Sequence, residues 1–162
     1  MIKAGVLTLS DKGSRGERED LSGPEVIRIL KEIGIETDRC EIVPDEAEII
    51  ARKLIEFVDE RKLDLVVTTG GTGVSPRDVT PEATLKVINR EIPGMAEAMR
   101  RESMLKTPHA MISRAVAGIR KTTLIVNLPG SPKGVRENLA VILPALKHAI
   151  EKIKGDPADC GS

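Results

Sequence analysis

The sequence predicts an α/β fold of three layers, with helices on both faces of a mostly parallel sheet. Apolar, β-branched runs of strand length at residues 2–9, 63–69 and 122–128 alternate with segments of helical spacing. This alternation is typical of parallel sheets, because each crossover helix returns the chain to the same sheet edge. With 162 residues, 40% of them hydrophobic, the chain can bury a single core. We expect one domain over residues 1–154 and a polar tail over residues 155–162.

Local signals predict the elements in chain order. A strand over residues 2–9 leads into a polar loop over residues 10–21, and the next helix begins at a capping-box pattern formed by Ser22 and Glu25. Gly34 ends that helix. The other expected elements are a strand near the sheet edge (36–43), a helix from 44–46 to about 58, a strand (63–69), helices at 80–88 and 94–105, a short edge strand (114–119), a strand (122–128) and a last helix (133–153) that Pro144 should kink or interrupt.

A glycine-rich loop after the strand at residues 63–69 is the most informative segment. The run TGGTG at residues 69–73 leads to Asp78 and then to a helix start, where Thr80 is placed to cap and Pro81 to occupy the first helical position. Glycines let backbone N–H groups approach an anion, and the helix N-terminus attracts it. A carboxylate beside bound phosphates usually implies a metal ion between them, so Asp78 also predicts a divalent cation.

Four loops, this one included, should converge at a single sheet edge. Ligands of open α/β sheets bind beyond the carboxyl ends of the strands. The loops expected there lie at residues 10–11, 44–45, 70–78 and 129–133, and each contributes a carboxylate, a hydroxyl or bare backbone donors. We therefore predict one site built by these four loops.

Composition excludes several classes of function. The chain has 25 basic and 25 acidic residues, and its lone aromatic residue is a Phe. Nucleic-acid binding needs a cationic face, and single-strand binding needs stacking aromatics, so neither is expected. No apolar run is long enough to span a membrane, no signal peptide is visible, and there are only two cysteines. We therefore expect a cytoplasmic protein without nucleic-acid or membrane partners.

Known catalytic motifs also fail to fit. The glycines lack the third glycine of the dinucleotide fingerprint and the Gly-Lys-Ser/Thr ending of a Walker loop. No histidine pair at metal-ligand spacing, Cys-x-x-Cys motif or nucleophile elbow is present. A phosphate loop with carboxylates and no covalent nucleophile suits phosphoryl or nucleotidyl transfer, in which positioning and charge stabilisation dominate.

The loop and its flanks resemble the molybdenum-cofactor biosynthesis proteins over nearly the whole chain. The resemblance rests on TGGTG at 69–73 with RDVTPE at 77–82, supported by shorter matches: Ser10-Asp11, Asp20-x-Ser22-Gly23, PDE at 44–46, PGM at 93–95, Ser113-Arg114 and NLPGSPK at 127–133. It implies a stand-alone adenylyltransferase that uses Mg²⁺ to join AMP from ATP to molybdopterin, with release of pyrophosphate. It also implies a homotrimer and hand-over of the product to a molybdate-inserting enzyme.

The resemblance assigns roles to individual residues. Asp45 and Asp78 match the two aspartates that the family uses, and we expect both to position magnesium and phosphate. The further candidates for substrate or nucleotide binding are Asp11, Ser22, Gly70, Gly71, Thr72, Gly73, Ser75, Glu82, Gly130, Ser131 and Lys133.

Most of these residues also allow a purely local role. Asp45 could cap the helix that follows it, Asp11 could form an Asx turn, and Asp78 could be a turn residue. Glu82 would favour a helix dipole without any substrate. Three further interpretations are local as well: caps at Ser22, Thr80 and Ser131, a solvated Lys133, and an ion pair of Arg77 in place of phosphate binding.

Two other functions stay open at this point. A protein of the same fold could be a non-catalytic molybdopterin-binding scaffold, or a regulatory domain that binds nucleotides. A scaffold has no need for both Asp45 and Asp78 beside a phosphate loop. A regulatory domain would bind ATP whether or not the pterin is present.

Overall fold

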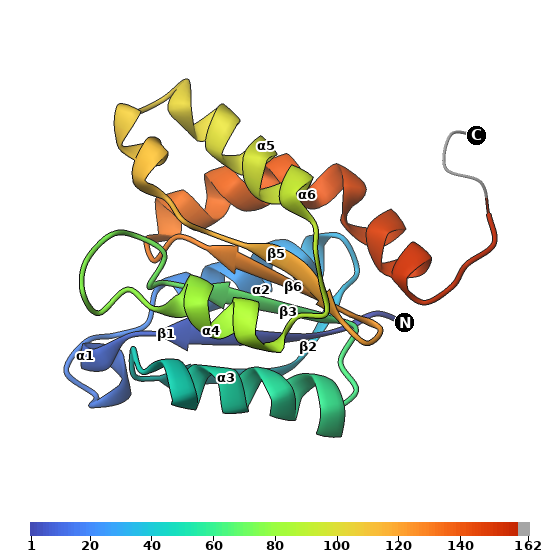
Figure 1. The fold of residues 1–162 in the computed structure, drawn as a ribbon, viewed down its shortest axis with the longest axis horizontal. Coiled ribbons are helices and arrows are strands. Elements are labelled where there is room, and N and C mark those ends of the chain that lie inside the picture. Colours follow the sequence, from blue (N-terminus) through green and yellow to red (C-terminus); the bar gives the residue numbers. More distant parts are fainter. Residues whose placement is uncertain (159–162) are drawn as a thin grey trace.

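The computed structural model describes residues 1–158 and has a six-stranded sheet with helices on both faces, which confirms the predicted fold class (Figure 1). The strand order is β2-β1-β3-β6-β5-β4. Strands β2, β1, β3 and β6 are parallel, and β5 and β4 add an antiparallel edge. The strands are β1 (Lys3–Leu9), β2 (Glu36–Val43), β3 (Leu65–Thr69), β4 (Arg90–Glu91), β5 (Ala117–Arg120) and β6 (Thr123–Leu128).

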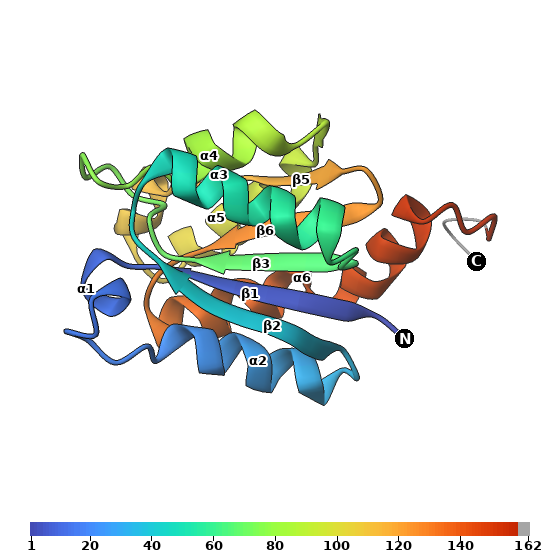
Figure 2. The same ribbon diagram turned by 90° about the horizontal axis from the view of Figure 1, so that it is seen from below.

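The helices divide between the two faces of the sheet (Figures 1 and 2). Helices α2, α5 and α6 pack on one face, and α3, η1 and α4 cover the other. Their bounds are α1 (Asp11–Ser14), α2 (Ser22–Glu32), α3 (Ala47–Ile55), the π-helix η1 (Glu56–Glu60), α4 (Thr80–Val87), α5 (Pro93–Met104), the 3-10 helix η2 (Pro108–Ile112) and α6 (Pro132–Ile153).

Alternating side chains of the central strands supply both halves of the core. In β3, Leu65 and Val67 join the cluster under α2, α5 and α6, whereas Val66 joins the cluster under α3, η1 and α4. Successive side chains of a strand point to opposite faces, so a strand covered on both faces is apolar throughout. This explains why β3 and β6 are buried along their whole length.

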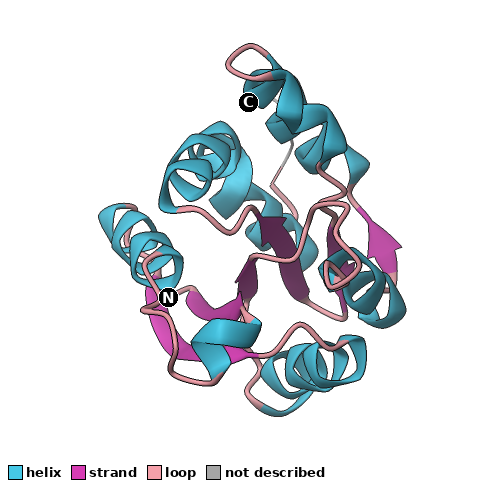
Figure 3. Cartoon of the chain, turned by 90° about the vertical axis from the view of Figure 1, so that its left-hand side faces the viewer, coloured by secondary structure: helices cyan, strands magenta, loops and turns pink. Residues whose placement is uncertain are grey.

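The strand order creates a switch point between β1 and β3. From β1 the chain crosses through α2 to β2 on one side, and from β2 it crosses through α3 on the opposite face to reach β3. The loops after β1 and β3 therefore lead away to opposite faces and open a crevice beyond the strand ends. Figure 3 looks onto this carboxyl edge of the parallel strands.

Two expected elements differ from the structure. The loop over residues 10–21 contains the short helix α1, which begins because the Ser10 hydroxyl accepts a hydrogen bond from the Gly13 N–H at 2.9 Å. The strand expected at 114–119 is β5, but β4 pairs with its outer side, so β5 is not the edge. Strand β4 has only two residues, too few for any periodicity to reveal.

Three predicted helix starts or breaks can also be compared with the structure. Ser131 caps α6 as expected, since its hydroxyl accepts from the Gly134 N–H at 3.0 Å. The capping box at Ser22 is wrong: the Asp20 carboxylate accepts the Gly23 N–H at 3.0 Å and the Ser22 hydroxyl at 3.3 Å. Helix α6 runs through Pro144 without interruption.

Across residues 1–158, no helix is both long enough and apolar enough to cross a membrane. Part of the tail predicted for residues 155–162 lies outside these described residues.

Candidate functional site

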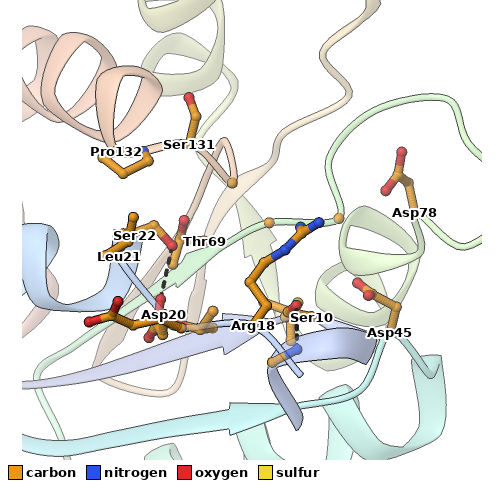
Figure 4. Close-up of a pocket in the computed structure, with 17 residues that line it drawn as sticks. Ser10, Arg18, Asp20, Leu21, Ser22, Asp45, Thr69, Asp78, Ser131 and Pro132 are labelled. Atoms are coloured by element: carbon orange, nitrogen blue, oxygen red, sulfur yellow. Dashed lines mark hydrogen bonds between the residues drawn. The ribbon is translucent and has the colours of Figure 1, made fainter. Parts of the chain in front are cut away.

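A cavity of about 660 Å³ lies at the switch point (Figure 4). The loops after β1, β2, β3 and β6 all contribute to its lining, as the sequence predicted. Seven of the predicted site residues line it: Ser22, Asp45, Gly70, Gly71, Asp78, Gly130 and Ser131.

The other predicted residues lie elsewhere around the glycine loop. Thr72, Gly73 and Lys133 line a second cavity of about 370 Å³, and Ser131 lines both cavities. Asp11, Ser75 and Glu82 line neither. The side chain of Lys133 is 77% exposed, and its ammonium group lies 3.8 Å from the Glu137 carboxylate. This position agrees with the interpretation of Lys133 as a solvated surface residue.

Close backbone packing requires glycine at the end of β3. Gly70 has φ +104°, and an ideal Cβ there would lie 2.5 Å from the Leu9 carbonyl oxygen. The Gly70 N–H donates to the Leu128 carbonyl at 3.0 Å. A Cβ on Gly130 would also lie 3.3 Å from the Gly70 Cα. Backbone from three segments therefore meets closely at this point, and a side chain at position 70 would clash with the Leu9 carbonyl.

Thr80 does not cap α4, contrary to the sequence prediction. The helix begins at Thr80 itself, so Pro81 occupies the second position and Val79 precedes the helix. The Thr80 hydroxyl instead donates to the Gly70 carbonyl at 2.9 Å, and the Thr80 N–H donates to the Gly71 carbonyl at 3.1 Å. Thr80 thus ties the start of α4 to the glycine loop.

The capping role considered for Asp45 is also wrong. Glu46 occupies the N-cap position of α3, and no side chain there makes a capping hydrogen bond. Asp45 and Asp11 instead exchange hydrogen bonds. The Asp11 N–H donates to Asp45 Oδ2, and the Asp45 N–H donates to Asp11 Oδ1, both at 3.0 Å. This pair joins the loop after β1 to the loop after β2 and orients both carboxylates.

Arg77 forms the local ion pair that was considered for it. Its Nε and Nη2 atoms donate to the two carboxylate oxygens of Asp11 at 3.0 and 2.9 Å. The hydrogen bond from Arg77 lowers the pKa of Asp11, and the same contact raises the pKa of Arg77. Asp11 therefore links Arg77 to the backbone of Asp45.

The environment of Asp45 in the cavity disfavours its charged form. Burial raises the pKa of Asp45, and the hydrogen bond from the Asp11 N–H partly offsets this effect. The negative charges of Asp11 and Asp78 act in the same direction as burial. Asp78 also accepts the Ser75 N–H at 3.0 Å through Oδ2, so its turn role and its place in the cavity coexist. A cation between Asp45 and Asp78 would relieve their repulsion.

Two carboxylates suit Mg²⁺ that is bound together with substrate phosphates, and they are too few for a metal site built from protein side chains alone. Among residues 1–158, no three His, Cys, Asp or Glu side chains are grouped so that they could hold a metal ion. Mg²⁺ usually keeps several waters and binds one or two carboxylates together with substrate phosphates. Asp45 and Asp78 would supply those two carboxylates.

Three charged lining residues were missed as site candidates: Arg18, Glu19 and Asp20. Asp20 lines the cavity and accepts the Thr8 hydroxyl at 2.9 Å, in addition to its contacts with Ser22 and Gly23. The spacing Asp20-x-x-Gly23 is a capping signal that could have revealed it. Arg18 is the one cationic side chain in the lining as described, which also contains the carboxylates of Glu19, Asp20, Asp45 and Asp78. Arg18, Asp20, Asp45 and Asp78 can be followed in Figure 4. Arg18 lies in a loop, so no hydrophobic periodicity of the sequence could have pointed to it.

The raised pKa of Asp45 leads to a prediction about stability. Below the ordinary value of 3.8 the carboxyl group is protonated in both folded and unfolded chains, and its stabilising contribution is complete. This contribution is lost as the pH rises through the higher folded pKa. The unfolding free energy of Asp45→Asn should therefore increase relative to that of wild type as the pH rises above 3.8, as measured by urea unfolding.

Asp59→Asn is the control, because we expect the opposite change in unfolding free energy. Its hydrogen bond with Arg120 lowers the pKa of Asp59 to about 2, so this carboxylate stabilises the fold above pH 3.8 and ceases to do so as the pH falls through about 2. Asp59→Asn should lose stability at neutral pH. A loss of stability in Asp45→Asn that also grows with pH would contradict the assignment for Asp45.

The site can be compared with known proteins. Residues 5–148 match a family described as a probable molybdopterin binding domain. A molybdopterin adenylyltransferase from Helicobacter pylori J99 is 46% identical over 157 residues, which cover 96% of this chain and 89% of that protein. The Escherichia coli K12 molybdopterin adenylyltransferase is 44% identical over 140 residues, 85% of this chain and 72% of that protein.

A solved structure of a related protein supports the same family. The molybdopterin biosynthesis enzyme MoaB from Thermus thermophilus is 49% identical and superposes with a TM-score of 0.90, covering 98% of this chain and 100% of that one. Its fold therefore matches the sheet and helices described above. The chain belongs to the family of probable molybdopterin-binding domains.

Proposed function

We propose that the protein is a molybdopterin adenylyltransferase of molybdenum cofactor biosynthesis, transferring AMP from ATP to the terminal phosphate of molybdopterin and releasing pyrophosphate. The observation that supports this most is the placement of Asp45 and Asp78 in one cavity with Gly70 and Gly71. The relatives with this name, at 44–46% identity over most of the chain, support the same reaction.

The reaction forms one P–O bond and breaks another. An oxygen of the molybdopterin phosphate attacks the α-phosphorus of ATP, and the bond to the bridging oxygen breaks so that pyrophosphate leaves. Both reactants are anions, so the protein must hold them together against their repulsion. Backbone N–H groups of the glycine loop and the guanidinium of Arg18 bind phosphate oxygens. Magnesium, held by Asp45 and Asp78, would neutralise charge on the phosphates.

The two cavities offer room for the two substrates. Both border the glycine loop, through Gly70 and Gly71 on one side and Thr72 and Gly73 on the other. Ser131 lies in both linings. We assign the nucleotide to the larger cavity, which holds the carboxylate pair, and the pterin to the smaller one. The two phosphates would then meet above the loop.

The wider setting belongs to the same proposal. A homotrimer and hand-over of the product to a molybdate-inserting enzyme follow from the family resemblance. The cytoplasmic location expected from the cysteine content belongs to the proposal as well. The rival functions are a non-catalytic molybdopterin-binding scaffold and a regulatory domain that binds nucleotides. The carboxylate pair favours the enzyme, because burial beside two other carboxylates raises the pKa of Asp45 and a scaffold gains nothing from that arrangement.

Pyrophosphate release from ATP tests the proposal directly. We expect release only when the protein, molybdopterin and Mg²⁺ are all present. Molybdopterin binding without release would favour the scaffold. Magnesium-dependent ATP binding that is indifferent to molybdopterin, again without release, would favour the regulatory domain.

Asp78→Asn should keep the fold and lose most of the turnover. The change removes the negative charge with little change in volume, and the amide oxygen can still accept the Ser75 N–H. We expect kcat to fall by roughly 100-fold or more, as for the loss of a main electrostatic group. Turnover near that of wild type, with an unchanged thermal midpoint, would contradict the magnesium role of Asp78.

Arg18→Gln should raise the KM for ATP by about 10-fold with a smaller effect on kcat, because a charge-assisted contact to phosphate is lost. Arg15→Gln is the matched control. Arg15 lies in the same segment, pairs with Glu17 at 3.0 Å and does not line the cavity. Equal KM values in both variants would exclude a phosphate contact by Arg18.

A further inference from the structure

Arg114 reaches into the glycine loop from a different part of the chain. It lies between η2 and β5, beside Ser113, which lines the smaller cavity. Its backbone N–H donates to the Thr72 carbonyl at 2.8 Å. Its side chain donates to two more carbonyl oxygens, from Nε to Gly73 and from Nη2 to Asp78, both at 2.7 Å.

These contacts close the base of the loop that bears Asp78. Residues 74–77 are all exposed, and the loop extends away from the core between Gly73 and Asp78. The guanidinium of Arg114 binds the carbonyl oxygens at both of these ends. Within the loop, Ser75 and Asp78 exchange hydrogen bonds at 2.9 and 3.0 Å, which hold its local turn but not its position relative to the cavity.

The chemistry of the contact requires arginine. A guanidinium has five N–H donors in a rigid plane and can bind three acceptors in different directions. Here the third acceptor is the Glu82 carboxylate, 2.5 Å from Nη1, at the start of α4. Glu82 thus contacts Arg114, and the arginine joins the loop to the helix after it. An ammonium group at this position would have no planar fork with which to reach all three oxygens.

We propose that Arg114 is a positioning residue for nucleotidyl transfer, which holds the loop over residues 73–78 so that Asp78 stays in the cavity lining together with Asp45. Its guanidinium acts through the backbone carbonyl of Asp78 and leaves the carboxylate of that residue in the cavity lining. The inference rests on the proposed function, because it assumes that Asp45 and Asp78 bind a divalent cation together with a nucleotide.

Arg120 provides a matched control. It also binds one carboxylate and one backbone carbonyl: Asp59 at 3.0 and 2.8 Å, and Val87 at 2.9 Å. Neither Arg120 nor these partners line the two cavities. Replacing Arg120 should therefore affect stability without affecting the site.

The test measures Mn²⁺ binding by electron paramagnetic resonance in the presence of α,β-methylene-ATP, whose α–β linkage the enzyme cannot cleave. The proteins are wild type, Arg114→Lys, Arg114→Gln and Arg120→Lys. We expect the Mn²⁺ dissociation constant to rise roughly 10- to 100-fold in both Arg114 variants, as for loss of a residue that orients a metal ligand. It should stay near the wild-type value in Arg120→Lys.

The outcomes separate the two proposals. Wild-type affinity in a folded Arg114 variant would overturn the role of Arg114 and leave the proposed function intact. An equal loss of affinity in Arg120→Lys would also overturn it, since the effect would then come from general destabilisation. No Mn²⁺ binding by the wild-type protein would overturn the metal role of Asp45 and Asp78, and with it the inference.

Discussion

Parallel pairing of β1 with β3 is the constraint on which the site depends. This pairing sets Thr8 opposite Thr69, so the two strands end next to each other and their following loops begin side by side at Ser10 and Gly70. Strand β6 pairs on the other side of β3 and brings the loop at Gly130 to the same edge. Three backbones then meet more closely than side chains allow, which explains the positive φ angle and the glycine at position 70. The cavity lies beyond this point, where the loops after β1 and β3 lead to helices on opposite faces of the sheet.

Electrostatics gives that cavity its chemistry. Carboxylates outnumber cationic side chains in its lining, although the substrates we propose are anions themselves. Such a lining is unfavourable unless cations enter with the ligand, and burial already raises the pKa of Asp45. Arg77 lies near but is held by Asp11 through two hydrogen bonds. The excess of carboxylates in the lining would repel a free nucleotide and accept one that carries a divalent cation. The site would in this way discriminate between the free and the metal-bound nucleotide.

Local sequence signals correctly predicted two of the helix ends. Gly34 ends α2 with a positive φ angle, and Ser131 caps α6, because both effects need only neighbouring backbone. The same signals failed where a tertiary partner competed. Thr80 donates to the Gly70 carbonyl in place of capping α4, and Asp45 exchanges hydrogen bonds with Asp11 in place of capping α3. In these two cases contacts from distant loops replaced the local ones. The cap expected at Ser22 failed for a local reason, because Asp20 accepts the Gly23 N–H.

The sequence by itself determined the α/β class, the parallel arrangement of the central strands and the four loops that build the site. Hydrophobic periodicity and glycine positions encode these features, and both are visible along the chain. The tertiary structure alone decided which side chains share the cavity. It placed Arg18 and Asp20 in the lining, left Asp11 and Glu82 outside it, and brought Arg114 to the loop at Asp78. Contacts between residues 36 positions apart depend on how the helices and sheet pack, and no local pattern specifies them.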